Sequence, residues 1–167
     1  QSRSSAASDV YKRQMVVTSS IPRCIEYFYA INKHLAERHS PYKAIVAFSG
    51  DHKYNGQEPP LTSAIMNGFA DSKIPKEFKK DPYRFLVVAD MFQTGFDEPL
   101  LHTMYVDKQL YDIQAVQTLS RLNRCHPKKH DTCVLDFANK PEIIQESFSR
   151  YYRTTILSGE TDPNKLY

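Results

Sequence analysis

Short apolar runs alternate with polar and helical segments along most of this sequence. A nearly continuous apolar run is typical of a strand that is covered on both faces of a parallel sheet. Five such runs are found, at residues 15–17, 44–48, 85–89, 103–106 and 133–137. Between the first two, apolar residues recur at helical spacing, which predicts an amphipathic helix over residues 22–38, capped by Ser19 or Ser20.

The remaining segments complete an alternation of strands and helices. Residues 51–60 are polar and are expected to form a loop, and residues 61–71 are weakly helical. Residues 72–83 are rich in Lys and Pro and are expected to be a connection, whereas Pro141 is expected to open a last helix. The pattern predicts an α/β domain with three layers and a mainly parallel sheet. In such a sheet, residues 18–20, 48–50 and 94–97 are expected at the carboxyl ends of the strands, because each group follows a predicted strand.

We expect three parts in this chain. Residues 1–14 are polar, with no period, and are predicted to be a disordered or non-native leader. Residues 15–140 would form the α/β domain. Residues 141–167 would form a C-terminal helix and the start of a following helical region.

The candidate chemistry centres on residues 117–124. Gln117, Arg121 and Arg124 are spaced i, i+4, i+7, so on one continuous helix they would share a face. The opposite face would carry a core stripe of Ala115, Leu119 and Leu122. Most charged helix stripes are simply solvated faces. Here, however, residues 94–99 form a Gly- and Asp-containing loop after a predicted strand, and two guanidiniums near such a loop favour a phosphate-binding edge.

Composition narrows the class of protein. The chain is 41% hydrophobic and 25% charged, with a formal charge of +3, which is typical of a globular domain and permits a polyanionic partner without requiring one. Three cysteines without framework spacing favour reduced thiols and a cytoplasmic location. No apolar run is long enough to span a bilayer.

The order of several motifs resembles that of superfamily-two helicases and translocases. Residues 117–124 follow the pattern Q-x-x-G-R-x-G-R of the last helicase motif, with Ser120 and Asn123 at the glycine positions. Thr94-Gly95-Phe96-Asp97 resembles the preceding motif, and residues 16–19 and 48–50 resemble earlier ones. The fuller run of residues 94–101, 105–108 and 120–124, ending in Asp136-Phe137-Ala138-Asn139, is similar to the R (motor) subunit of type I restriction endonucleases.

This resemblance implies a second RecA-like motor lobe, with roles for particular residues around ATP. Arg121 and Arg124 match arginines that contact phosphate, and Arg124 is the candidate arginine finger. Gln117 matches a residue that senses nucleotide or couples the two lobes. Gly95 would permit close backbone approach, and Asp97 would contact either the nucleotide ribose or the arginine helix.

The same resemblance implies partners. Thr18, Ser19, Ser49 and Thr94 would hydrogen-bond phosphates of double-stranded DNA. A first RecA-like lobe and a nuclease domain of the same subunit would accompany this lobe, together with modification and specificity subunits. ATP and Mg²⁺ would be bound mainly by the first lobe, because this sequence contains no G-x-x-x-x-G-K-[ST] loop and no acidic metal box. We therefore expect an ATP-dependent enzyme of which this segment alone is inactive.

Other functions remain open at this point. The lobe could belong to another DNA or RNA helicase, or act as a nucleic-acid-binding module without catalysis. A zinc site would need Cys125, His126, His130 and Cys133, but their spacing matches no ordinary structural-zinc pattern, so we assign no metal ligand. A nuclease site would need carboxylates and a lysine around a metal ion. Triplets of an acidic residue, any residue and a lysine occur only in polar connections, which favours solvated side chains over a nuclease site.

Overall fold

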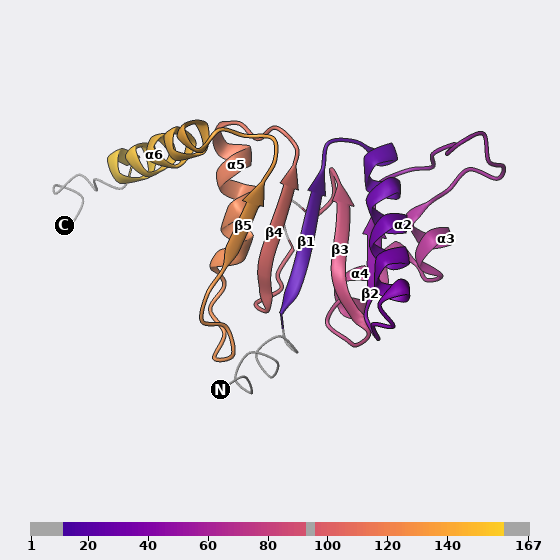
Figure 1. Cartoon of the computed structure of the whole chain (residues 1–167). Helices are drawn as coiled ribbons and strands as arrows, with labels where there is room; N and C mark the ends of the chain where they lie inside the picture. The colour runs from indigo at the N-terminus through magenta and orange to yellow at the C-terminus, as the bar shows by residue number, and fades with distance from the viewer. Residues whose placement is uncertain (1–11, 93–95, 159–167) are drawn as a thin grey trace, which may run out of the picture.

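The strands of the described chain form one parallel sheet with helices against both faces (Figure 1). The computed structural model describes residues 12–92 and 96–158, with the backbone alone for 154–158. The strand order is β2-β3-β1-β4-β5, and every neighbouring pair is parallel. The strands are β1 (Arg13–Thr18), β2 (Lys43–Ala47), β3 (Tyr83–Ala89), β4 (Leu101–Asp107) and β5 (Cys133–Asp136).

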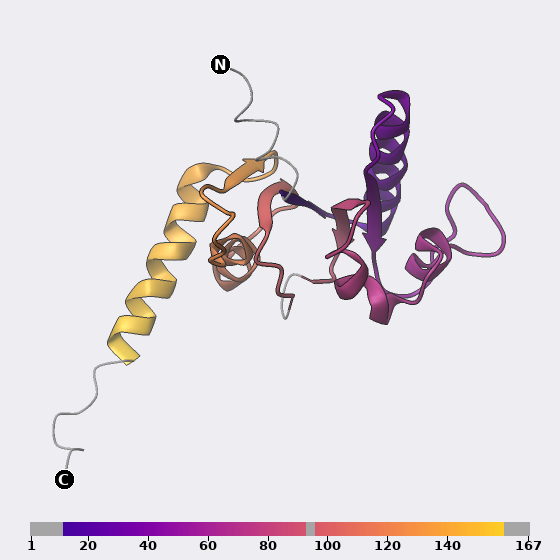
Figure 2. The same ribbon diagram turned by 90° about the horizontal axis from the view of Figure 1, so that it is seen from below.

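Helices lie on both faces of this sheet, and the last of them packs on the helix before it. They are α2 (Ile21–Glu37), α3 (Ser63–Asn67), α4 (Ile74–Glu77), α5 (Asp112–Leu119) and α6 (Pro141–Ser158), with 3₁₀ turns η1 (Asp71–Lys73) and η2 (Ser120–Asn123). Figure 2 shows α2 on one face of the sheet and α4 and α5 on the other. The predicted three-layer α/β architecture, as in RecA-like domains, is confirmed.

Alternate residues of each central strand enter different cores, as the two-residue repeat of a strand requires. Val16 and Val87 pack with Cys24 and Ile25 of α2. Met15 and its neighbours on the same face pack with residues of α4 and α5. The strand β1 begins at Arg13, two residues before the apolar run that predicted it. Residues 1–11 lie outside the described residues, so the leader stays a prediction.

The start of α2 has the predicted cap. Ser20 is the N-cap, its side chain accepts the Arg23 backbone N–H at 3.4 Å, and Pro22 lies in the first turn. The helix ends at Glu37, close to the predicted end at residue 38. This cap fixes α2 directly after β1.

The short helix α3 covers the outer edge of β2. Asn67 accepts the Val46 N–H at 2.9 Å and donates to the Val46 carbonyl at 2.7 Å. The Ser63 hydroxyl likewise accepts the Phe48 N–H and donates to the Phe48 carbonyl. These side chains replace a neighbouring strand, so the edge is not left open for pairing with another chain.

Two predictions about the elements are wrong. Residues 72–83 were expected to be a connection, but they contain α4, whose Ile74 is buried, and the buried Phe78. A proline in the first turn is compatible with a helix, so Pro75 does not prevent α4. The strand β5 was expected to be buried, but Cys133, Val134 and Leu135 are exposed.

The exposure of β5 has a structural cause. Among the described residues, α2 packs on β2, β3 and β1 and leaves β4 and β5 uncovered on its side of the sheet (Figure 2). An open groove of about 450 Å³ lies there, lined by apolar side chains that include Tyr27, Ile31, Tyr105 and Phe137. None of the helices in the described part of the chain has the length and apolar character needed to cross a membrane.

Candidate functional site

The arginine segment, residues 117–124, begins as an α-helix and continues as a 3₁₀ turn. The helix α5 ends at Leu119, η2 follows over Ser120–Asn123, and Arg124 is extended, with φ −76° and ψ 129°. The prediction of one continuous helix over residues 117–124 is therefore wrong beyond Leu119. Ser120 and Asn123 are residue types that favour caps and turns over helix interiors, which accounts for this change.

The apolar side of this segment faces the core as predicted. Ala115 and Leu122 are 0% and 3% exposed, whereas Leu119 is half-buried against the same cluster. This packing fixes where the polar side of α5 and η2 points. Gln117 is exposed on α5, but the break at Ser120 removes the regular spacing that would have put it on one helix face with Arg124.

Both arginines contact the loop that precedes β4. The Arg121 guanidinium donates to the Phe96 carbonyl at 3.0 Å, and Arg121 is half-buried. The Arg124 Nε lies 3.1 Å from Asp97 Oδ1, and these two side chains are 54% and 65% exposed. Both arginines are therefore held at this loop, and the Arg124–Asp97 pair is accessible to solvent. Thr94 and Gly95, the other predicted residues of this loop, lie outside the described residues.

This cluster lies at the amino ends of the strands. Arg13, the first residue of β1, donates its N–H to the Leu100 carbonyl at 3.1 Å, and Lys79 Nζ donates to the Asp97 carbonyl at 3.2 Å. The sequence suggested instead that residues 94–97 would lie at the carboxyl ends, because they follow the strand β3. That expectation is wrong for Asp97, since the chain has already returned across the sheet to begin β4.

Lys129 lies against the end of the arginine segment. Its ammonium donates to the carbonyls of Leu122 and Arg124, the latter at 3.0 Å. Burial lowers the pKa of Lys129 from its ordinary value, and the buried Glu98 acts against this shift. Sequence reasoning missed Lys129, because a lysine in a turn such as residues 126–129 is usually solvated.

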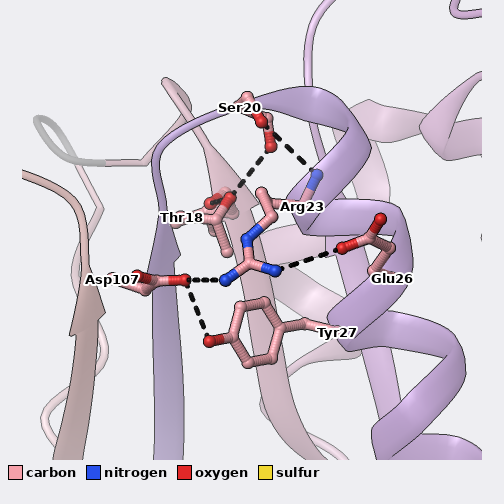
Figure 3. A network of polar contacts seen from close by, with 7 residues as sticks. Thr18, Ser20, Arg23, Glu26, Tyr27 and Asp107 are labelled. Atoms are coloured by element: carbon pink, nitrogen blue, oxygen red, sulfur yellow. Dashed lines mark hydrogen bonds and ion pairs between the residues drawn. The ribbon is translucent and has the colours of Figure 1, made fainter. Parts of the chain in front are cut away.

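A second polar network lies at the opposite, carboxyl end of β1 and β4 (Figure 3). The Arg23 guanidinium is 3.2 Å from Asp107 Oδ2, and the Tyr27 hydroxyl donates to the same oxygen at 2.9 Å. Arg23 also pairs with Glu26 at 3.4 Å. These contacts attach the first turns of α2 to the end of β4. The sequence contained no signal for this pairing, since Arg23 and Asp107 lie far apart in the chain.

The charges of this network shift two pKa values. Asp107 raises the pKa of Arg23, and burial together with the hydrogen bond to Asp107 raises the pKa of Tyr27. Tyr27 therefore remains neutral and Arg23 charged at physiological pH. Arg23 carries a positive charge at the solvent-facing end of α2, but two carboxylates already compensate it.

The residues predicted to contact DNA differ in accessibility. Ser19 and Ser49 are exposed at the carboxyl ends of β1 and β2. Thr18 is fully buried, and its hydroxyl donates to the Val88 carbonyl at 2.8 Å. In this conformation a phosphate cannot reach the Thr18 hydroxyl, which instead joins β1 to β3.

The arginines and the serines thus lie at opposite ends of the sheet. Within residues 12–92 and 96–158, His, Cys, Asp and Glu side chains form no group of three that could hold a metal ion. Cys125 and Cys133 are exposed free thiols.

Comparison with known proteins gives a consistent result. Residues 62–139 match the family model of type I restriction enzyme subunit R domain 3. The putative type I restriction enzyme MjaIXP endonuclease subunit of Methanocaldococcus jannaschii is 30% identical over 142 residues, 83% of this chain. The type I restriction enzyme HindI endonuclease subunit of Haemophilus influenzae is 25% identical over 157 residues, 87% of this chain. The matched segments are 13% and 14% of those two relatives.

Proposed function

Because this chain belongs to the R subunits of type I restriction enzymes, we propose that it is the second motor lobe of an ATP-dependent double-stranded DNA translocase. DNA cleavage would occur elsewhere in the same subunit. The complete enzyme would be a type I site-specific deoxyribonuclease. Its modification and specificity subunits would supply sequence recognition, since the candidate contacts here are to phosphates.

One observation carries this proposal: Arg124 pairs with Asp97 at a solvent-accessible place, and Arg121 donates to the adjacent Phe96 carbonyl. Transfer of a phosphoryl group requires positive charge on the oxygens of the transferred and leaving phosphates. Arg124 is exposed enough to reach a nucleotide on an opposing lobe, while its backbone is fixed by the packing of Leu122. Arg121 would have a more restricted role, because it is half-buried and bonded to Phe96.

ATP and Mg²⁺ would be held mainly by the first lobe. This chain supplies cationic groups but contains no phosphate loop of its own. Its contribution would be positioning and charge stabilisation, with Asp97 holding Arg124 until nucleotide binds. Closure of the two lobes would then transfer Arg124 from the carboxylate to a phosphate.

Double-stranded DNA would bind at the other end of the sheet. Ser19 and Ser49 are accessible there and would donate hydrogen bonds to phosphate oxygens. The buried Thr18 would not touch DNA; its hydrogen bond to the Val88 carbonyl would hold the end of β1 against β3. A nucleotide at the amino ends of the strands and DNA at the carboxyl ends would allow the lobe to couple the two by rigid-body movement.

The test is ATP hydrolysis by a complete R subunit that contains this segment. Arg124→Ala should lower DNA-stimulated hydrolysis by about 10³-fold or more and leave DNA binding nearly unchanged. Arg38→Ala, an exposed arginine at the end of α2, is the matched control and should hydrolyse ATP normally. Normal hydrolysis by Arg124→Ala would instead favour a nucleic-acid-binding module without catalysis.

A further inference from the structure

The end of the arginine segment needs hydrogen-bond donors that its own helix does not supply. The last carbonyl groups of a helix have no intrahelical partner. In η2 and at Arg124 these carbonyls are followed by an extended chain, so the turn would be held only by packing on one side. Lys129 supplies the donors by reaching back from the loop that leads to β5.

We propose that Lys129 is a positioning residue that holds Arg124 in place for its action on ATP, an inference that rests on the proposed function. Lys129 Nζ donates to the carbonyl of Arg124 itself and to that of Leu122, two residues earlier. One ammonium thus links both ends of the last turn. The backbone of Arg124 is fixed, while its side chain is left to move.

The surroundings of Lys129 support a role beyond ordinary solvation. Its ammonium is partly buried, and Glu98, only 4% exposed, lies near enough to favour the charged form. Glu98 in turn accepts the Leu100 N–H at 3.0 Å, which fixes it in the loop before β4. The Arg124–Asp97 pair and the two Lys129 hydrogen bonds attach both loops to the same turn.

The side chain of Arg124 is held much more weakly than its backbone. Its ion pair with Asp97 is exposed on both sides, and such pairs contribute little free energy. Arg124 can therefore exchange a carboxylate for a phosphate with little loss, provided that its backbone does not move. Lys129 supplies that condition, because the loss of its two bonds would free the turn to shift.

The neighbouring lysine offers a matched control. Lys128 is exposed, and its backbone N–H donates to His126 Nδ1 at 3.1 Å, whereas the donor to the Leu122 and Arg124 carbonyls is the Lys129 ammonium. Lys128→Met and Lys129→Met remove the same charge one residue apart. A difference between these variants therefore reports the two carbonyl contacts and not the net charge of the loop.

The experiment measures ATP hydrolysis by a complete R subunit containing this segment, with DNA and the partner subunits present. Lys129→Met should lower kcat by about 10- to 100-fold, the effect of a misplaced catalytic group, with KM for ATP changed less than about threefold. Lys129→Arg, which can still donate to both carbonyls, should restore kcat to within about fivefold of the wild type. Lys128→Met should match the wild type. Thermal unfolding shows that each variant is folded.

The outcomes separate this inference from the proposed function. If Arg124→Ala abolishes hydrolysis but folded Lys129→Met retains the full kcat, Lys129 has no positioning role and the proposed function stands. If Arg124→Ala retains hydrolysis, the proposed function fails and this inference fails with it. If Lys129→Met does not fold, Lys129→Arg decides: a folded Lys129→Arg with kcat lowered as far as in Arg124→Ala would overturn the inference, and recovery would support it.

Discussion

Arg124 and Leu122 lie two residues apart, but substituting Leu122 should destabilise the fold and substituting Arg124 should leave its stability nearly unchanged. Leu122 is 3% exposed and belongs to the core beneath the sheet. Arg124 forms an ion pair with Asp97, and both side chains are more than half exposed. If this segment presents its arginines for chemistry and not for structure, Leu122→Ala must destabilise the domain and Arg124→Ala must not.

The expected magnitudes differ several-fold. Truncating a fully buried leucine to alanine raises the free energy of the folded state by about 2–5 kcal/mol, through lost burial and a residual cavity. Removing one partner of an exposed ion pair changes it by at most about 1 kcal/mol. Leu119→Ala should fall between these values, because Leu119 is only half-buried against the same cluster.

Urea unfolding of the 167-residue chain measures these differences. The chain contains no tryptophan, so far-UV circular dichroism is the appropriate signal. With a slope of about 2 kcal/mol per molar urea, Leu122→Ala should lower the midpoint by about 1–2.5 M and Arg124→Ala by less than about 0.5 M. Equal shifts for the two variants, or a larger one for Arg124→Ala, would refute the assignment of the two faces.

Three further predictions concern the isolated segment. It should hydrolyse no ATP with or without duplex DNA, since it contains no phosphate loop; turnover that survives repurification would contradict this. It should bind unrelated duplexes equally and weakly, with affinity falling linearly in log units against log salt, whereas a sequence preference kept at high salt would exclude purely phosphate contacts. Cys24 is fully buried, and burial raises the pKa of its thiol to about 12. At pH 8 a thiol reagent should therefore label Cys125 and Cys133 rapidly and Cys24 only on unfolding; three equally fast thiols would show that the α2 core is open.

The sequence predicted the central strands well because each is an uninterrupted apolar run. The strands β1, β2 and β3 are covered on both faces over most of their length, which is what a continuous apolar run in a parallel sheet predicts. The same rule predicted the strand β5 but not its exposure. Whether an apolar strand is buried depends on a helix packing over it, and the run itself does not show this. The helix α4 was missed since its two buried residues, Ile74 and Phe78, lie among lysines and a proline.

The candidate site was predictable in its residues but not in its geometry. The motif order put Arg121 and Arg124 near the loop of residues 94–99; in the structure Arg124 pairs with Asp97, and Arg121 donates to the neighbouring Phe96 carbonyl. The sequence did not predict that this cluster lies at the amino ends of the strands. Residues 94–97 follow β3 in the chain and were therefore expected to stay at its carboxyl end. Lys129 could not be found from spacing, since its partners are backbone carbonyls, which every residue possesses.

The central claim is that Arg124 acts on the chemical step of ATP hydrolysis, and a single-turnover measurement tests it most directly. A complete R subunit containing this segment is bound to DNA and mixed with a smaller amount of ATP. The first-order rate of ATP hydrolysis is recorded together with the ATP dissociation constant. We expect Arg124→Ala to slow ATP hydrolysis by about 10³- to 10⁵-fold and Arg124→Lys to restore little of this rate, while the affinity for ATP changes far less. Hydrolysis of bound ATP at the wild-type rate by the Arg124→Ala variant would contradict this role of Arg124.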